Sequence, residues 1–218
     1  MGAVFSPDAN WRYVLVTFEG IEGAGKSTLI AALAADARAR GETVLATKEP
    51  GGTPFGDAVR ELFVDPMFAI GPVAEVMLVN ASRAQLVADV IGPALKAGTT
   101  VLCDRFFDAT VAYQGYGRGL DIEGLLDICL AATQRIAPNL TFLLDIPVPL
   151  SRERVAARGG ADRLEREGEA FHARVREGYL QLAKRFPRIH ILDGTLPPGD
   201  VLAMARTEID RRRAAAYP

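Results

Sequence analysis

The 218-residue sequence predicts an α/β protein, a three-layer α/β/α sandwich around a five-stranded parallel sheet. Three observations predict this fold class. Short apolar runs rich in β-branched residues alternate with longer runs rich in Ala, Leu and Arg. The short runs are apolar on both faces, as parallel strands covered by helices must be. A glycine-rich turn joins the first strand to the first helix.

Five short runs are expected to form the strands. The first is of the fully buried type and ends at Glu19-Gly20, where the glycine-rich turn begins. The expected strands are Val14–Phe18, Thr43–Thr47, Thr100–Asp104, Leu140–Asp145 and Ile189–Asp193.

Six longer runs with helical periodicity lie between or after these strands. They are Ser27–Arg40, Val73–Lys96, Gly119–Ala137, Pro149–Arg158, Glu165–Arg185 and Pro198–Arg213. No internal repeat and no Gly-, Pro- or Ser-rich linker divides the chain, so we expect one domain over residues 13–218, after an N-terminal extension of residues 1–12.

Composition excludes several classes of protein. With 25 Lys and Arg against 27 Asp and Glu, the formal charge is −2, so nucleic acid and anionic membranes are not expected partners. No run approaches the ~18 apolar residues of a membrane helix, and the N-terminus lacks a signal-peptide pattern. The two cysteines, Cys103 and Cys129, lie in apolar runs, which favours a reducing compartment. A cytoplasmic protein is expected.

The glycine-rich turn predicts a phosphate-binding loop, typical of the P-loop NTPase type of sandwich. Residues 20–27, Gly-Ile-Glu-Gly-Ala-Gly-Lys-Ser, match G-x-x-x-x-G-K-[ST] between a strand and a helix. The glycines let backbone N–H groups wrap a polyphosphate, and the helix start adds free N–H groups and positive dipole. The expected ATP-binding residues are Gly20, Ile21, Glu22, Gly23, Ala24, Gly25, Lys26, Ser27 and Thr28.

Two oxygen ligands for Mg²⁺ are expected beside this loop. They are the Ser27 hydroxyl and the carboxylate of Asp104, which ends a buried strand. Mg²⁺ is therefore the expected cofactor. A GTPase is disfavoured because none of Asn10, Asn80 and Asn139 is followed by the Lys of a guanine-reading Asn-Lys-x-Asp motif.

The segment 152–164 is rich in arginine and contains Gly159-Gly160. By itself such a segment is usually a solvated helix end followed by a turn. Beside a phosphate site it is also consistent with a short arginine-bearing lid, since phosphoryl transfer requires cationic charge and exclusion of water.

Five segments, in order, resemble the bacterial thymidylate kinase family, from about Tyr13 to the C-terminus. They are residues 18–28; Glu49-Pro50-Gly51-Gly52-Thr53 with Arg60; Ser82-Arg83-Ala84-Gln85; Asp104-Arg105-Phe106 with Ala112-Tyr113-Gln114-Gly115; and Asp162-Arg163-Leu164-Glu165. The resemblance implies transfer of the ATP γ-phosphoryl group to dTMP, giving ADP and dTDP.

The resemblance also implies roles for individual residues. Arg60 and Arg105 would bind the acceptor phosphate, and Arg83 would reach the thymine carbonyl, since guanidinium groups form bidentate contacts with such oxygens. Lys26, Arg105, Arg154 and Arg158 would be catalytic. Of the remaining groups, Glu22 would lie near the sugar or the acceptor phosphate, Tyr113 beside the deoxyribose, and Thr110 and Gln114 at the base edge. The expected substrate-binding residues are thus Glu22, Pro50, Arg60, Val79, Arg83, Arg105, Thr110, Tyr113 and Gln114.

The base pocket departs from the family pattern. Val79 stands where an aromatic residue usually stacks on thymine, and Ser82, Leu86 and Ala109 are further departures. Two alternatives therefore remain open: a kinase for another deoxynucleoside monophosphate such as dUMP, and an ATP-binding module without catalysis. Residues 73–96 are either a homodimer face, as in the family, or core. Adenine is expected near residues 193–196 and Arg154.

Overall fold

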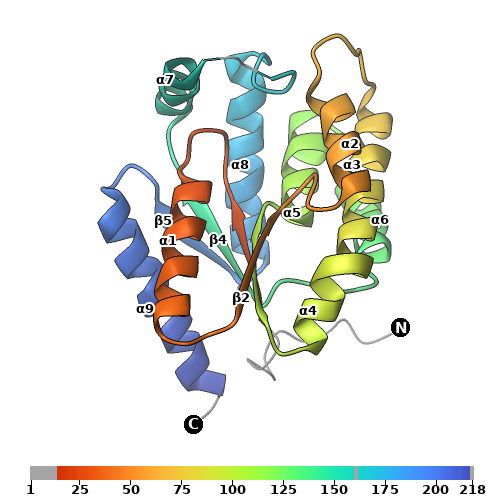
Figure 1. Cartoon of the computed structure of the whole chain (residues 1–218). Coiled ribbons are helices and arrows are strands. Elements are labelled where there is room, and N and C mark those ends of the chain that lie inside the picture. Colours follow the sequence, from red (N-terminus) through yellow and green to blue (C-terminus); the bar gives the residue numbers. More distant parts are fainter. Residues whose placement is uncertain (1–13, 160–161, 217–218) are drawn as a thin grey trace.

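A five-stranded parallel sheet forms the centre of the computed structural model, which describes residues 14–159 and 162–216 (Figure 1). The strands are β1 (Leu15–Glu19), β2 (Val44–Lys48), β3 (Thr100–Asp104), β4 (Leu140–Asp145) and β5 (Ile189–Asp193). Their order in the sheet is β2-β3-β1-β4-β5. All five expected strands are confirmed, and only β1 and β2 are shifted, by one residue each. The expected extension over residues 1–12 lies outside the described residues.

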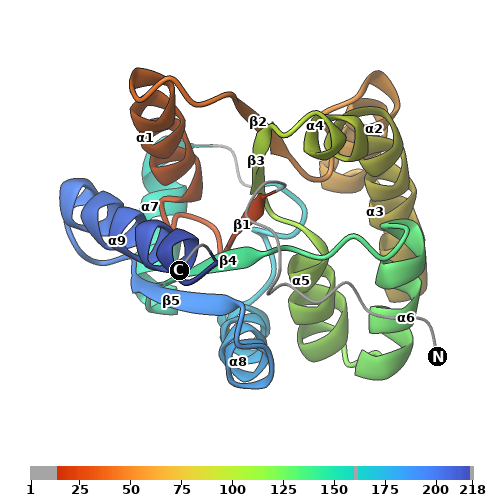
Figure 2. The ribbon, with the colours of Figure 1, turned by 90° about the horizontal axis from the view of Figure 1, so that it is seen from below.

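Helices cover both faces of this sheet, which confirms the three-layer class. Figure 2 shows α1 (Lys26–Ala39) and α9 (Pro198–Ala216) on one face. A larger set, including α4 (Gly92–Lys96), α5 (Phe107–Thr110) and α8 (Glu169–Arg185), lies on the other. Because both faces are covered, every residue of β1 is buried, with Leu15 in one apolar cluster and Val16 and Phe18 in the other.

The helix expected over Val73–Lys96 is helical throughout but not uniformly α-helical. It consists of α3 (Pro72–Leu86), the π-helical segment η1 (Val87–Ile91) and α4. Pro93 has no N–H to donate and its ring clashes with a normal α-turn, and the wider π-turn directly before it accommodates this.

Residues 105–137 differ most from the sequence prediction. The helix expected over Gly119–Ala137 is only α6 (Ile122–Ala132), which begins at its cap Asp121, whose Oδ2 accepts from Gly124 N at 2.7 Å. It is followed by Gln134 and Arg135 with positive φ, which ends the helix. Two elements were not predicted: α5, and the π-helical segment η2 (Val111–Gly117) that continues it.

A further helix, α2 (Pro54–Val64), was also not predicted, although the sequence carries a helix-start signal before it. Thr53 caps it by accepting from Gly56 N at 2.9 Å, and Pro54 occupies the first helical position. The remaining helix, α7 (Val148–Arg158), and α8 follow β4 and agree with the expected ranges, except that α8 begins after Gly168 rather than at Glu165.

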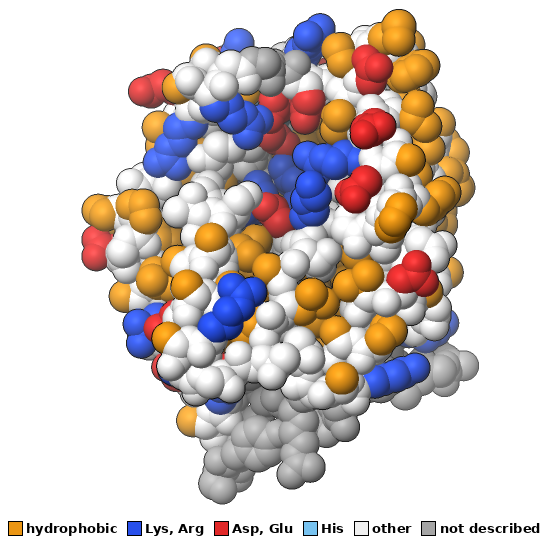
Figure 3. Space-filling model, in the orientation of Figure 1, with side chains coloured by type: hydrophobic (Ala, Val, Ile, Leu, Met, Phe, Trp, Pro, Cys, Tyr) orange, Lys and Arg blue, Asp and Glu red, His pale blue; other side chains and the backbone are white. Residues whose placement is uncertain are grey.

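All five strands run in one direction, so their carboxyl ends meet at one edge of the sheet. In Figure 1 this edge faces upward, between α7 and the pair α2 and α3. Figure 3 shows the same face of the molecule hollowed there, with Lys and Arg side chains gathered in the hollow. Within residues 14–159 and 162–216, no helix combines the length and apolar character that crossing a bilayer requires.

Candidate active site

One cavity of about 680 Å³ lies at the carboxyl ends of the strands. The glycine-rich turn, β3, α2, α3, α5 with η2, and the residues Arg158, Asp162, Leu164 and Glu165 form its wall. Many of the site residues expected from the sequence line this cavity. They are Glu22, Gly23, Gly25, Lys26, Ser27, Thr28, Pro50, Arg60, Val79, Arg83, Asp104, Arg105, Thr110, Tyr113, Gln114 and Arg158. The structure thus brings together every residue expected to bind substrate or metal. Gly20, Ile21, Ala24 and Arg154 do not line the cavity.

The glycine-rich turn owes its shape to two glycines. Gly20 has φ +131°, and a Cβ there would lie 2.4 Å from Leu144 O, so no side chain fits between the turn and β4. Gly25 precedes α1 with φ 98°, in the left-handed region that disfavours other residues. The turn therefore delivers Lys26 and Ser27 as the first residues of α1, where free backbone N–H groups and the helix dipole favour an anion.

Lys26 folds back over this turn. Its Nζ donates to Gly20 O at 3.0 Å and to Ile21 O at 3.2 Å. Burial, together with the positive charge of Arg105, lowers the pKa of Lys26 to about 8. An anion bound beside Nζ would reverse this trend and hold the ammonium charged.

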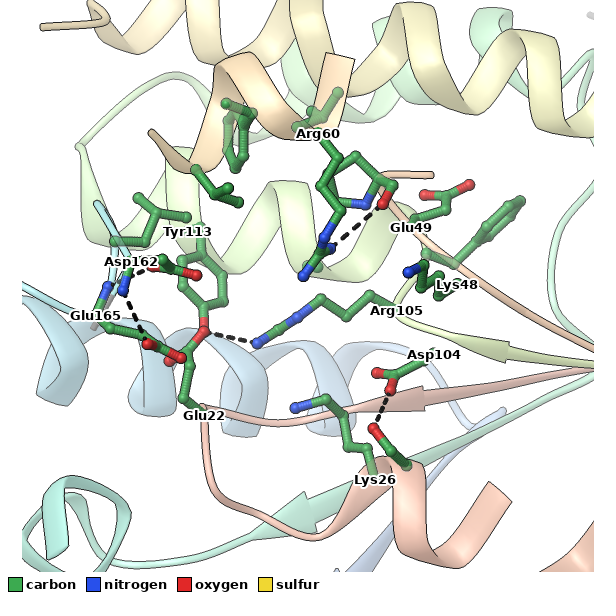
Figure 4. A pocket seen from close by; sticks show the side chains of 18 of the residues that line it. Glu22, Lys26, Lys48, Glu49, Arg60, Asp104, Arg105, Tyr113, Asp162 and Glu165 are labelled. Atoms are coloured by element: carbon green, nitrogen blue, oxygen red, sulfur yellow. Dashed lines mark hydrogen bonds and ion pairs between the residues drawn. The ribbon is translucent and has the colours of Figure 1, made fainter. Parts of the chain in front are cut away.

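Ser27 and Asp104 meet as expected for a shared cation. Ser27 Oγ donates to Asp104 Oδ2 at 2.7 Å, although the two residues lie in α1 and at the end of β3 (Figure 4). A hydroxyl and a carboxylate are hard oxygen donors of the kind that Mg²⁺ binds, usually with waters and substrate phosphates completing its shell. The residues present therefore fit Mg²⁺.

Arg105 has the left-handed backbone conformation, with φ 69°, directly after β3. This region is costly for a residue with a Cβ, so the surrounding contacts must hold it. The guanidinium donates to Gly20 O at 3.1 Å and to Tyr179 Oη at 3.0 Å through Nη1, and to Glu22 Oε1 at 2.7 Å through Nη2. These contacts aim the side chain across the cavity toward Glu22 and Tyr113 (Figure 4).

Glu22 anchors both Arg105 and Tyr113. The Tyr113 hydroxyl donates to Glu22 Oε1 at 2.5 Å, and the Arg105 guanidinium lies over the Tyr113 ring at 5.0 Å. Burial acts to raise the pKa of Glu22, but Arg105, Lys26 and the Tyr113 hydrogen bond outweigh it and lower that pKa below its usual value. Glu22 is therefore an anion inside a cluster of cations.

Glu19 lies behind this cluster and was missed by sequence reasoning. Its Oε1 accepts from Phe106 N at 2.7 Å, and its Oε2 accepts from Tyr179 Oη at 2.8 Å. Burial and the nearby Asp108 raise the pKa of Glu19 to about 8, although Arg105 opposes this. A glutamate at the end of a fully buried strand was the signal that could have identified it.

The opposite wall carries Arg60, whose Nη1 donates to Pro50 O at 3.3 Å. Arg60 and Arg105 point toward the same space from α2 and β3 (Figure 4). Two guanidinium groups facing one space can bind a dianion from both sides.

Arg83 has no free N–H group, so the expected hydrogen bond from its guanidinium to a base carbonyl is not available in this arrangement. It is 2% exposed and donates five hydrogen bonds, to Glu49 Oε2, Asn80 Oδ1, Cys129 Sγ, Phe106 O and Thr110 Oγ1. Burial raises the pKa of Glu49 to about 7 against the lowering effect of Arg83. In this structure Arg83 orders the wall of the cavity.

An aromatic ring near Val79 was also missed. Phe63 on α2 lines the same cavity as Val79 and is buried, with Arg163 over its ring at 5.0 Å. The i, i+4 spacing of Val59 and Phe63 after a Thr-Pro helix start was the signal available in the sequence.

The expected lid residues divide into two groups. Arg158 lines the cavity and pairs with Glu165, whereas Arg154 Nη1 donates to Gly23 O at 2.9 Å and to Gly194 O at 3.2 Å. Arg154 therefore joins α7 to the turn and to the loop after β5. Burial and the charge of Glu22 raise the pKa of Asp162, which also lines the cavity.

Comparisons with known proteins agree with the resemblance seen in the sequence. A model of the thymidylate kinase family matches residues 18–205. The thymidylate kinase of Deinococcus radiodurans is 48% identical over 200 residues, which cover 91% of this chain and 97% of that protein. That of Citrifermentans bemidjiense is 50% identical over 194 residues, or 85% of each. The crystal structure of thymidylate kinase from Ehrlichia chaffeensis superposes with a TM-score of 0.75 at 30% identity, covering 91% of this chain and 98% of that one.

Proposed function

Because the chain belongs to the thymidylate kinase family, we propose that it transfers the γ-phosphoryl group of ATP to dTMP, giving ADP and dTDP. The observation that carries this proposal is the continuity of the cavity. A single space extends from the phosphate-binding turn, past Arg60 and Arg105, to an apolar end at Val79. Such a space suits the triphosphate of the donor at the turn, the phosphate of the acceptor beside the two arginines, and the base of the acceptor at the Val79 end.

The donor end is assigned to residues 20–28. The backbone N–H groups of this turn bind the ATP phosphates, and Lys26 leaves the carbonyls of Gly20 and Ile21 to contact the β- and γ-phosphates. Mg²⁺, held by Ser27 and Asp104, neutralises charge on the phosphates when it is bound. The loop after β5 and Arg154 are assigned to the adenine side.

The acceptor phosphate is assigned to Arg60 and Arg105. Their guanidinium groups hold it from two sides in line with the γ-phosphoryl group, and Glu22 fixes Arg105 from behind. Arg158, which also lines the cavity, spreads positive charge over the transferring group. Tyr113 packs beside the deoxyribose.

The proposed test is ADP release from Mg-ATP with dTMP, dUMP, dCMP, dGMP and dAMP offered in parallel. Turnover is expected to be strongest with dTMP, and Lys26→Met, which removes the phosphate-binding ammonium, is the inactive control. Strongest turnover with another monophosphate would replace dTMP as the acceptor. ATP binding without turnover on any of them would favour the non-catalytic module.

We also propose a homodimer formed through α2, α3 and the segment between them. Large apolar side chains are exposed there: Phe55, Leu62, Met67, Phe68, Val73 and Met77. Figure 3 shows hydrophobic side chains along the corresponding edge of the molecule. Contiguous exposed apolar surface of this kind marks an interface. Light scattering on wild type and on a Met77→Lys variant tests this, with a monomeric wild type contradicting it.

Free, buried Cys103 and Cys129 support a reducing, cytoplasmic setting.

A further inference from the structure

The base end of the cavity presents two side chains one helical turn apart, Thr110 on α5 and Gln114 on η2. Both are buried, 2% exposed each, and both line the cavity. A hydroxyl or a carboxamide is ambiguous by itself, because each group can donate or accept a hydrogen bond. What lies behind each side chain therefore decides what it offers to a ligand.

Behind Gln114 lies Glu75, a fully buried carboxylate on α3. Gln114 Nε2 donates to Glu75 Oε2 at 2.9 Å, and an ionised carboxylate has no hydrogen to return. The amide group must therefore turn its NH₂ toward Glu75. Gln114 Oε1 is left as the outward group, and it forms no hydrogen bond among the described residues.

Glu75 is held in its ionised form by two arginines. Arg118 Nη2 lies 3.0 Å and Arg163 Nη1 2.5 Å from Glu75 Oε1. Burial acts to raise the pKa of Glu75, but the hydrogen bonds from Arg118, Gln114 and Arg163 outweigh it and lower that pKa. The acceptor that orients Gln114 thus stays an acceptor at neutral pH.

Behind Thr110 lies the opposite charge. Arg83 Nη2 donates to Thr110 Oγ1 at 3.0 Å, and a guanidinium cannot accept a hydrogen bond. The threonine hydroxyl is therefore fixed as an acceptor on that side, and its own hydrogen has no acceptor among residues 14–159 and 162–216. Thr110 offers a donor to the cavity.

We propose that Glu75, acting through Gln114, is a positioning residue that selects 4-oxopyrimidines over cytosine. The pair Thr110 and Gln114 then presents a donor beside an acceptor. Thymine and uracil offer the complementary edge, a carbonyl O4 beside an N3–H, whereas cytosine offers an amino group beside an unprotonated N3. Cytosine would leave both protein groups facing like groups, and such mismatches reject a ligand strongly. The inference rests on the proposed function, because it assumes that a nucleobase occupies this end.

The test compares kcat/KM for dTMP, dUMP and dCMP in wild type, Glu75→Gln and Glu167→Gln. The Glu75→Gln variant keeps the shape but lets the Gln114 amide rotate, so the dTMP-to-dCMP ratio is expected to fall tenfold or more, mainly through a higher KM for dTMP. The dTMP-to-dUMP ratio should not change, since both bases share the same edge. The Glu167→Gln variant removes a charge that pairs with Arg118 Nη1 at 2.6 Å and leaves the contacts of Glu75 with Gln114, Arg118 and Arg163 in place, so its ratio should stay within twofold of wild type.

A folded, active Glu75→Gln variant with an unchanged dTMP-to-dCMP ratio would overturn the inference while leaving the proposed function intact. A wild-type protein without turnover on dTMP would overturn the proposed function and this inference with it. If thermal melting shows that Glu75→Gln does not fold, Gln114→Met gives the same readout, because it leaves the pairs of Glu75 with Arg118 and Arg163 in place. The ratio should fall there too, and a wild-type ratio in Gln114→Met would also overturn the inference.

Discussion

The Tyr113 hydroxyl donates a 2.5 Å hydrogen bond to Glu22 Oε1, the same oxygen that accepts from Arg105 Nη2 at 2.7 Å. One carboxylate oxygen therefore orients both a ring of the cavity wall and the guanidinium assigned to the acceptor phosphate. The two donors come from η2 and from the end of β3, and Glu22 comes from the glycine-rich turn. The relationship ties the donor end of the cavity to its acceptor end.

Removing the Tyr113 hydroxyl should therefore weaken acceptor use without removing the ring. A hydrogen bond to a charged group contributes ~1.5–3 kcal/mol, so we expect Tyr113→Phe to lower kcat/KM for dTMP by about tenfold. Tyr116→Phe is the matched control, because Tyr116 is on the same segment and does not line the cavity. Equal steady-state constants for the two variants would contradict the role given to this hydroxyl.

Arg158→Ala should reduce turnover far more than acceptor affinity. An arginine that stabilises a transferring phosphoryl group contributes about 10³–10⁵ in kcat in related chemistry, and we expect a loss of at least about 100-fold with KM for dTMP changed less than about threefold. Arg152→Ala removes an exposed arginine of the same helix that does not line the cavity, and it should be nearly neutral. An unchanged kcat in Arg158→Ala would remove Arg158 from the mechanism.

ATP affinity should fall at alkaline pH because of Lys26. The pKa of Lys26 is lowered to about 8 in the ligand-free protein, so the ammonium that binds phosphate is lost above that pH. We expect the Kd of ATP, measured by calorimetry, to rise by up to about tenfold per pH unit above 8. Glu19→Gln should retain this slope, which excludes the titration of Glu19 as its cause, and Lys26→Gln should bind weakly with no slope.

Phe63 should supply the ring that Val79 lacks. An aromatic contact contributes ~0.5–1.5 kcal/mol beyond area burial, so Phe63→Leu should raise the KM for dTMP about fivefold with little change in kcat. Glu61→Gln, at an exposed position on α2 that does not line the cavity, is the control. If both variants leave KM at the wild-type value, the base is not in contact with Phe63.

Stability should decrease from acid to neutral pH because of Glu19. Its pKa is raised from 4.5 to about 8 on folding, so between these values the folded state holds a proton that the unfolded chain has released. The contribution is fully present below pH 4.5 and is lost as the pH rises to 8, by at most ~1.4 kcal/mol per pH unit.

Urea unfolding at pH 5 and pH 8 measures this effect in wild type and in Glu19→Gln. The variant should lose less stability between the two values than wild type, with Glu49 contributing a remaining slope of the same sign because its pKa is about 7. Glu123→Gln, at an exposed position, should behave as wild type. An identical slope in Glu19→Gln would show that Glu19 is ionised throughout.

Local sequence patterns were enough to predict the sheet and the glycine-rich turn, and they indicated that Ser27 and Asp104 lie side by side at the strand ends. These features depend on local patterns: apolar runs, glycines with positive φ, and strand ends that meet at one edge because parallel strands share a direction. The sequence also contains the signal for the start of α2, the cap Thr53 followed by Pro54, although this helix was not predicted. The π-turn of η1 had a local signal in Pro93, which lies shortly after it, whereas no proline lies within or directly after η2.

Which polar groups remain available to a ligand depends on contacts that form only in the folded chain. Arg83 has the residue type of a base-binding arginine, yet its five donors are engaged within the wall. Glu75 and Gln114 are 39 residues apart, and Glu19 and Tyr179 are 160 apart, so no local pattern could pair them. A hydrogen bond consumes a donor and an acceptor at once, and that count can be made only when the folded chain has brought the groups together.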